Sequence, residues 1–284
     1  MATQRRSLRD VIRSRQQSAF VGRQAQLALF EANLGYDPDD ERRRWVFNIH
    51  GPAGVGKTFL VKQWTRIAQT ADVAHAYLTD TVYDAPEAMA AIATALSQQD
   101  APLKRFQARY LVDRLRSHED VRLLLSPAEV LSPLFVQDLA ELGQQRQLAL
   151  FLDTYERTGS FLDPWLLDLL DGERYGDLPD TLTVTIAGQY PLDPNRWAPY
   201  HGLLADLPLE PFTELEAREL LARHGVTDPR VTEVIVALSG RLPLWVASLA
   251  ASRPDDPAAV GDPSGSAVER FCAGRTTHSA ATWR

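Results

Sequence analysis

The sequence predicts an α/β protein in which a parallel sheet is covered by helices on both faces and is followed by a small all-helical unit. Short, fully apolar segments alternate with helix-like segments, which is typical of a buried parallel sheet. A glycine-rich turn directly follows the first apolar segment. After about residue 211, only helical periodicity continues.

The expected strands are short runs rich in β-branched, aromatic and other apolar residues. They cover residues 45–50, 74–78, 148–152, 181–187 and 203–209. Apolar side chains at helical spacing predict helices over residues 57–70, 86–97, 103–117 and 133–145. In sheets of this kind, ligands bind at the carboxyl ends of the strands. Gly51, Asp153 and Gly188 each follow such an end, so we expect three segments to meet at one edge.

The C-terminal part is expected to be helical. Thr213 and Glu216 have the spacing of a capping box, which predicts a helix through Arg223. Further helices are expected over residues 228–238 and from Pro243, since proline is tolerated at the first helical position. The predicted organisation is a basic arm over residues 1–16, a core over 17–210, a helical unit over 211–251, and a linker and tail over 252–284.

Composition restricts the environment and the partners. The net charge is −7, so nothing global indicates a nucleic acid or an anionic membrane as partner. Cys272 is the sole cysteine, which excludes an intramolecular disulfide and favours a reducing cytoplasm. No apolar run approaches the roughly 18 residues that indicate a membrane-spanning helix.

Residues 51–58 fit the phosphate-binding pattern G-x-x-x-x-G-K-[ST] in full, between an expected strand and an expected helix. Glycines let backbone N–H groups close around phosphate oxygens, and the following helix points its N-terminus at the same anion. Lys57 is expected to reach the β- and γ-phosphates, and Thr58 to bind magnesium through its hydroxyl. The residues expected to bind the nucleotide here are Gly51, Pro52, Ala53, Gly54, Val55, Gly56, Lys57, Thr58 and Phe59.

A second candidate segment is the apolar strand that ends at Asp153. A carboxylate delivered beside a phosphate-binding loop has the Walker B arrangement, so Asp153 is expected to hold magnesium, in part through water. Glu156 follows and is expected to polarise the attacking water as a catalytic residue. The alternative is that Glu156 is an ordinary surface glutamate.

Three further motifs give the chain a resemblance to known proteins. F-V-G-R lies at residues 20–23, D-T-Y-E at 153–156 and S-G-R-L-P-L at 239–244. With the phosphate-binding loop, in this order, they resemble the STAND class and related AAA-like ATPases. The resemblance covers roughly residues 17–250.

The resemblance implies a three-layer P-loop NTPase core in which another strand separates the Walker B strand from the P-loop strand, followed by a helical lid. It also implies ATP and Mg²⁺ as cofactors. Val21, Gly22 and Arg23 would lie beside the adenine, and Pro243 would approach the base from the lid. Gln189 stands where such proteins often carry an arginine that senses the γ-phosphate, although Arg196 lies nearby in the sequence. We therefore count Gln189 among the catalytic residues and expect slow ATP hydrolysis.

The function implied is that of a STAND-like regulatory ATPase, a nucleotide-dependent conformational switch with a protein partner or self-association through its core. One alternative is a DNA-associated AAA-like ATPase of the replication-initiator type, which the acidic charge and the missing basic winged-helix domain disfavour. Another alternative is a small-molecule P-loop kinase, but the S-G-R-L-P-L motif at residues 239–244 does not fit that class. A nucleotide binder without hydrolysis stays open.

The C-terminal tail carries one more expectation. Residues 267–271 look like the first turns of an amphipathic helix, whereas the stretch from Cys272 has neither helical nor strand periodicity. We interpret the chain as a truncated form of a longer protein with an altered tail. The alternative is an ordinary disordered terminus.

Overall fold

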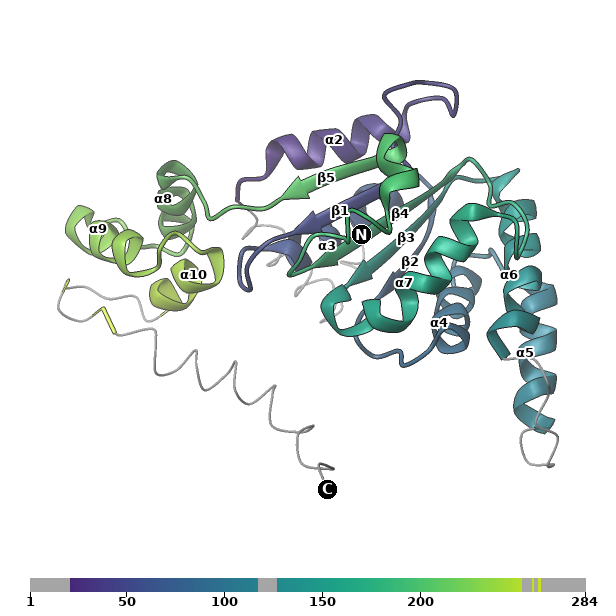
Figure 1. Cartoon of the computed structure of the whole chain (residues 1–284). Helices are drawn as coiled ribbons and strands as arrows, with labels where there is room; N and C mark the ends of the chain where they lie inside the picture. Colours follow the sequence, from purple (N-terminus) through teal and green to yellow (C-terminus); the bar gives the residue numbers. More distant parts are fainter. Residues whose placement is uncertain (1–20, 117–126, 252–256, 258–259, 262–284) are drawn as a thin grey trace, which may run out of the picture. The chain divides into compact units, whose positions relative to one another are not determined.

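The computed structural model describes residues 21–116, 127–251, 257, 260 and 261 (Figure 1). The expected basic arm, most of the linker and the tail with Cys272 lie outside the described residues. The chain divides into two compact units. Among the described residues, the larger unit comprises Arg23–Ala53 and, from Lys57 to Leu209, residues 57–116 and 127–209. The smaller unit groups Gly54–Gly56 with Val21, Gly22 and residues 210–251.

The larger unit is built on a five-stranded sheet in the order β2-β3-β4-β1-β5, in which every pair is parallel. Its strands are β1 (Val46–His50), β2 (Ala74–Leu78), β3 (Leu148–Asp153), β4 (Leu182–Gly188) and β5 (Leu204–Pro208). β4 separates β3 from β1, as predicted. The central strands β3 and β4 are buried along their whole length, which is why they consist of nearly continuous apolar runs.

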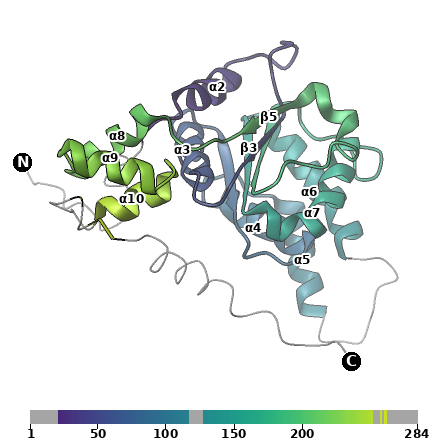
Figure 2. The ribbon, with the colours of Figure 1, turned by 60° about the vertical axis from the view of Figure 1, so that its left-hand side comes forward.

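Helices cover both faces of this sheet (Figures 1 and 2). They are α2 (Gln24–Leu34), α3 (Lys57–Thr70), α4 (Ala85–Ser97), α5 (Lys104–Arg116), α6 (Pro127–Gly143) and α7 (Tyr155–Asp171), with a short 3-10 helix, η1 (Ala198–Leu203). The predicted α/β class with a parallel sheet is confirmed. No helix among the described residues is long and apolar enough to cross a bilayer.

Aromatic side chains form the core between the sheet and helices α2 and α3. The rings of Phe30 and Trp64 stack at 4.5 Å, and Phe47 on β1 meets Trp64 edge-on at 5.1 Å. Phe151 on β3 lies 5.8 Å from Phe30. These rings fix α3 against the centre of the sheet.

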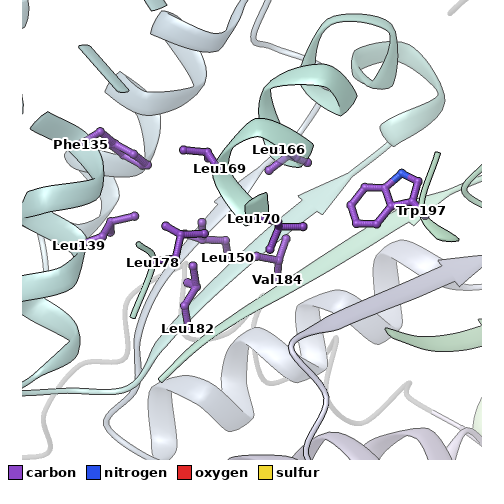
Figure 3. A pocket seen from close by; sticks show the side chains of 10 residues that line it. All are labelled: Phe135, Leu139, Leu150, Leu166, Leu169, Leu170, Leu178, Leu182, Val184 and Trp197. Atoms are coloured by element: carbon purple, nitrogen blue, oxygen red, sulfur yellow. The ribbon is translucent and has the colours of Figure 1, made fainter. Parts of the chain in front are cut away.

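The opposite face packs against α4, α6 and α7 through a larger apolar core. A small gap in this core lies between Phe135, Leu150, Leu166 and Trp197 (Figure 3). Its volume is about 10 Å³ and its lining is apolar, so it holds one water molecule at most and is a packing defect rather than a binding site.

The smaller unit contains α8 (Glu214–Arg223), α9 (Pro229–Leu238) and α10 (Pro243–Ala251). The predicted capping box is confirmed, because Thr213 and Glu216 exchange hydrogen bonds at the start of α8.

Two helix predictions need correction. The helix expected from Pro133 begins at Pro127, and Pro133 lies in its interior, where a proline lacks the N–H for the helical hydrogen bond. The prediction was wrong because it took the second proline for the starting one. Helix α7 was not predicted, since Gly159 and Pro164 interrupt its sequence with residues that disfavour helices. The strand at 74–78 has the predicted bounds, and the ends of the other strands shift by one residue at most.

Candidate nucleotide site

The phosphate-binding loop joins β1 to α3. Gly51, Gly54 and Gly56 have φ angles of 147°, 82° and 102°, a region that side-chain-bearing residues rarely adopt. The loop can therefore turn its backbone N–H groups toward one point. Helix α3 begins at Lys57 and adds the partial positive charge of its N-terminus there.

The Lys57 side chain folds back over this loop. Its Nζ donates to the carbonyl oxygens of Gly51 at 2.6 Å and Pro52 at 3.0 Å. Burial lowers the pKa of Lys57, while the carboxylates of Glu156 and Asp153 act in the opposite direction. The ammonium group is thus held by weak neutral acceptors that phosphate oxygens, which bind cations more strongly, would replace.

Asp153 ends β3 and is buried, with 3% of its surface exposed. Its Oδ2 accepts a hydrogen bond from the Tyr77 hydroxyl at 2.6 Å, and its Oδ1 accepts one from the Thr154 backbone N–H at 2.9 Å. Burial raises the pKa of Tyr77, and Asp153 raises it further, so the phenol keeps its proton and donates it. Sequence reasoning missed Tyr77, because nothing in its spacing from Asp153 marks the pair.

Thr154 makes the transition from β3 to α7 in a left-handed conformation, with φ 61° and ψ 39°. A β-branched residue is an outlier there, at a cost on the order of 1–3 kcal/mol. Such strain is concentrated at functional sites. Because of this turn, β3 ends at Asp153 and α7 already begins at Tyr155. The carboxylates of Asp153 and Glu156 are therefore only three residues apart in the chain.

Gln189, directly after β4, holds Glu156. The Gln189 backbone N–H donates to Glu156 Oε2 at 3.1 Å, and its side-chain Nε2 donates to Oε1 at 3.0 Å. Both oxygens of the candidate base are therefore engaged by one residue. The residue that stands in place of a phosphate-sensing arginine thus contacts the Glu156 carboxylate.

The sequence matches no protein-family model and no curated protein. Among solved structures, the chain is similar to a Walker-type ATPase of Pyrococcus abyssi, with 14% identity and a TM-score of 0.58 over 90% of this chain and 74% of that one. The chain has a P-loop NTPase fold.

Two other similarities are weaker. The RuvB Holliday junction branch migration motor of Thermotoga maritima gives 18% identity and a TM-score of 0.47, over 81% of this chain and 61% of that one. A STAND protein with a tetratricopeptide repeat sensor from Pyrococcus horikoshii gives 17% and 0.49, over 84% and 30%. With TM-scores below 0.5, neither carries a further argument.

Arg196, the second candidate for a phosphate sensor, forms an ion pair with the carboxylate of Asp163. Its Nη1 lies 2.9 Å from Asp163 Oδ2, and Asp163 Oδ1 accepts from the Tyr155 hydroxyl and the Trp197 indole N–H at 3.0 Å each. Arg196 and Asp163 line an open cleft of about 290 Å³ that borders Glu156. Arg196 would have to leave this buried acceptor to sense a phosphate.

Two residues of the F-V-G-R motif, Val21 and Gly22, belong to the smaller unit. Val21 is buried with the apolar side chains of α8, α9 and α10. Gly22 has φ 73°, and a Cβ there would lie 2.2 Å from Glu216 Oε1, so another residue would be strained and would displace the Glu216 side chain of the capping box. Arg23, the last residue of the motif, belongs to the larger unit and precedes α2 with φ 60°.

Pro243 begins α10 and lies near a glycine of the phosphate-binding loop that belongs to the same unit. Its Cγ is 3.9 Å from where a Cβ on Gly56 would be. The Leu244 backbone N–H donates to Gly54 O at 3.2 Å, and Leu244 Cβ is 3.0 Å from the corresponding position on Gly54. The S-G-R-L-P-L motif at residues 239–244 thus contacts Gly54 of the loop.

The donor set suits magnesium. No group of three or more His, Cys, Asp or Glu side chains that could hold a metal occurs among the residues that the structure describes. Mg²⁺ keeps several waters and needs one or two protein ligands beside the phosphates. Thr58, half-buried in the first turn of α3, and Asp153 carry side-chain oxygen atoms that could serve as ligands of that kind. Phe59, the last residue expected to bind nucleotide, is 51% exposed.

Proposed function

We propose that this chain is a STAND-like regulatory ATPase that binds ATP and Mg²⁺ at the loop of residues 51–58. The observation that carries the proposal is the loop itself, with three glycines at positive φ between β1 and α3, and with Asp153 ending a strand of the same sheet. The P-loop NTPase fold supports it, since ligands bind at this edge of such sheets.

In this proposal the loop backbone and Lys57 bind the phosphates, and Thr58 and Asp153 hold the metal. Bound Mg²⁺ would neutralise charge on the phosphate oxygens. Glu156 orients the attacking water and accepts its proton. Turnover is slow, because Gln189 engages both oxygens of Glu156 and offers phosphate no charge.

The switch is the helical unit. Its helix α10 hydrogen-bonds to Gly54 of the loop that would surround the phosphates, and Pro243 Cγ lies 3.9 Å from where a Cβ on Gly56 would be. A nucleotide that binds one conformation of this loop more tightly than another would favour the position of α10 that goes with that conformation. The equilibrium between the two positions would shift by the difference in binding free energy. The switch would act on a protein partner or on a second copy of the chain, in the cytoplasm.

A nucleotide binder without hydrolysis is the second candidate, favoured by the same Gln189–Glu156 contact. A phosphate-release assay beside a binding assay distinguishes the two functions. Binding of ATP-Mg²⁺ without release of phosphate above a no-protein blank identifies the binder.

Calorimetry with ATP-Mg²⁺ tests the proposal. Lys57→Ala should abolish measurable binding, because it removes the charge that faces the phosphates. The control is Lys62→Ala, which removes an exposed lysine one turn further along α3 and should bind like the parent protein. Near-parental affinity of Lys57→Ala would contradict the assignment of the loop.

A further inference from the structure

The carboxylate of Asp153 is held from two sides by neutral donors. Besides the backbone N–H of Thr154, it accepts a hydrogen bond from the hydroxyl of Tyr77, which lies on the neighbouring strand β2. At 2.6 Å this bond has the length of a strong hydroxyl–carboxylate hydrogen bond. Asp153 is buried, so losing a donor would leave one of its oxygens poorly solvated.

The strand register explains how a residue so distant in the sequence reaches Asp153. Tyr77 on β2 pairs with Phe151 on β3, two residues before Asp153. Side chains alternate along strands, so Tyr77 and Asp153 lie on the same face of the sheet. Phe151, directly opposite Tyr77 on that face, packs against Phe30 of α2 in the same core as Trp64 of α3. Helix α3, whose first turn contains Lys57 and Thr58, therefore covers the same face of the sheet.

We propose that Tyr77 is a positioning residue for magnesium: its hydroxyl fixes the orientation of the Asp153 carboxylate that faces the metal. The inference rests on the proposed function of this site. Each carboxylate oxygen has two acceptor positions, so one hydrogen bond to each oxygen still leaves one position on each for Mg²⁺ or its water.

A phenol suits this task because it is neutral. A lysine or an arginine at the same place would orient the acid and also offset the negative charge that attracts the cation. Mg²⁺ demands nearly ideal octahedral geometry, so a ligand that rotates freely binds it less well. Hydrogen-bond partners behind metal ligands commonly contribute about 10–100-fold to metal affinity or activity.

A purely structural role of Tyr77 makes a different prediction. β2 is an edge strand and Tyr77 is only half-buried, so a hydroxyl that served packing alone would lose little by facing water. A structural defect would weaken ATP binding with and without metal alike. A positioning role affects only the gain in affinity that magnesium provides.

The test compares ATP affinity by calorimetry in Mg²⁺ and in EDTA for the full chain and for Tyr77→Phe. The Phe variant should bind metal-free ATP like the parent, while the affinity gain due to Mg²⁺ falls by about tenfold or more. In an Asp153→Asn background, Tyr77→Phe should have no further effect on that gain, since the two residues act through one carboxylate.

The matched control is Tyr200→Phe, which removes a hydroxyl that hydrogen-bonds to Leu167 O at 3.4 Å elsewhere in the larger unit. Tyr77→Leu is a second variant in case Tyr77→Phe does not fold. An unchanged magnesium gain in a variant without the Tyr77 hydroxyl overturns the inference and leaves the proposed function standing. Equal losses in Mg²⁺ and in EDTA also overturn it. If the parent protein binds no ATP-Mg²⁺, the proposed function and the inference fail together.

Discussion

Gln189→Ala should accelerate hydrolysis. The substitution removes the 3.0 Å hydrogen bond from Gln189 Nε2 to Glu156 Oε1 and keeps the backbone bond to Oε2. A net hydrogen bond contributes about 0.5–1.5 kcal/mol, and Glu156 is exposed, so water competes for it. If Glu156 must release this bond to accept a proton from water, the barrier falls by about 1 kcal/mol. Since 1.36 kcal/mol is tenfold in rate, turnover should rise about fivefold.

Phosphate release at saturating ATP-Mg²⁺ measures this effect, with calorimetry to verify that affinity is unchanged. Gln145→Ala is the matched control, because this exposed glutamine precedes β3 and so lies at the opposite edge of the sheet. The acceleration should vanish in a Glu156→Gln background. A turnover that falls or stays at the parental value would mean that Gln189 aligns Glu156 rather than restrains it, and the reasoning would be refuted.

Two further changes probe the same turn. Glu156→Gln should keep ATP-Mg²⁺ affinity and slow hydrolysis by about 10²-fold or more, as expected for a lost general base; parental turnover would make Glu156 a surface residue. Thr154→Gly should stabilise the protein by about 1 kcal/mol, because glycine adopts φ 61° without strain. For a chain of this size, that is a rise in Tm of about 2–4 °C in thermal unfolding. A lower Tm would show that the Thr154 side chain contributes more than the strain costs.

The sequence predicted the structure best where a clear hydrophobic period ends at a sharp boundary, or where the backbone requires glycine. The strand at Ala74–Leu78 and the helix at Lys57–Thr70 have the predicted limits, since each combines an unambiguous period with a sharp boundary. The strand order was also implied correctly, with β4 between β1 and β3. The glycines of the loop have the positive φ angles that the motif requires.

Contacts between segments distant in the sequence could not be predicted in this way. Tyr77 reaches Asp153 only because β2 pairs with β3 in one register, and a shift by a single residue would turn the phenol to the other face. Likewise, Gln189 was assigned the place of a phosphate-sensing arginine because of its position after β4, whereas its partner depends on where the unpredicted helix α7 begins. The roles of these residues stay predictions.

The arrangement around the end of β3 separates two functions that are adjacent in the chain. Asp153 is oriented from β2 through Tyr77, and Glu156 from β4 through Gln189. Between them lies Thr154, whose left-handed backbone is the bend that turns the two carboxylates toward different neighbours. The two hydrogen bonds share no donor and come from opposite sides of β3, so the roles proposed for Asp153 in metal binding and for Glu156 in proton transfer depend on different neighbouring strands. Such a site can keep nucleotide affinity high while turnover stays low, which is the combination that a long-lived ATP-bound switch requires.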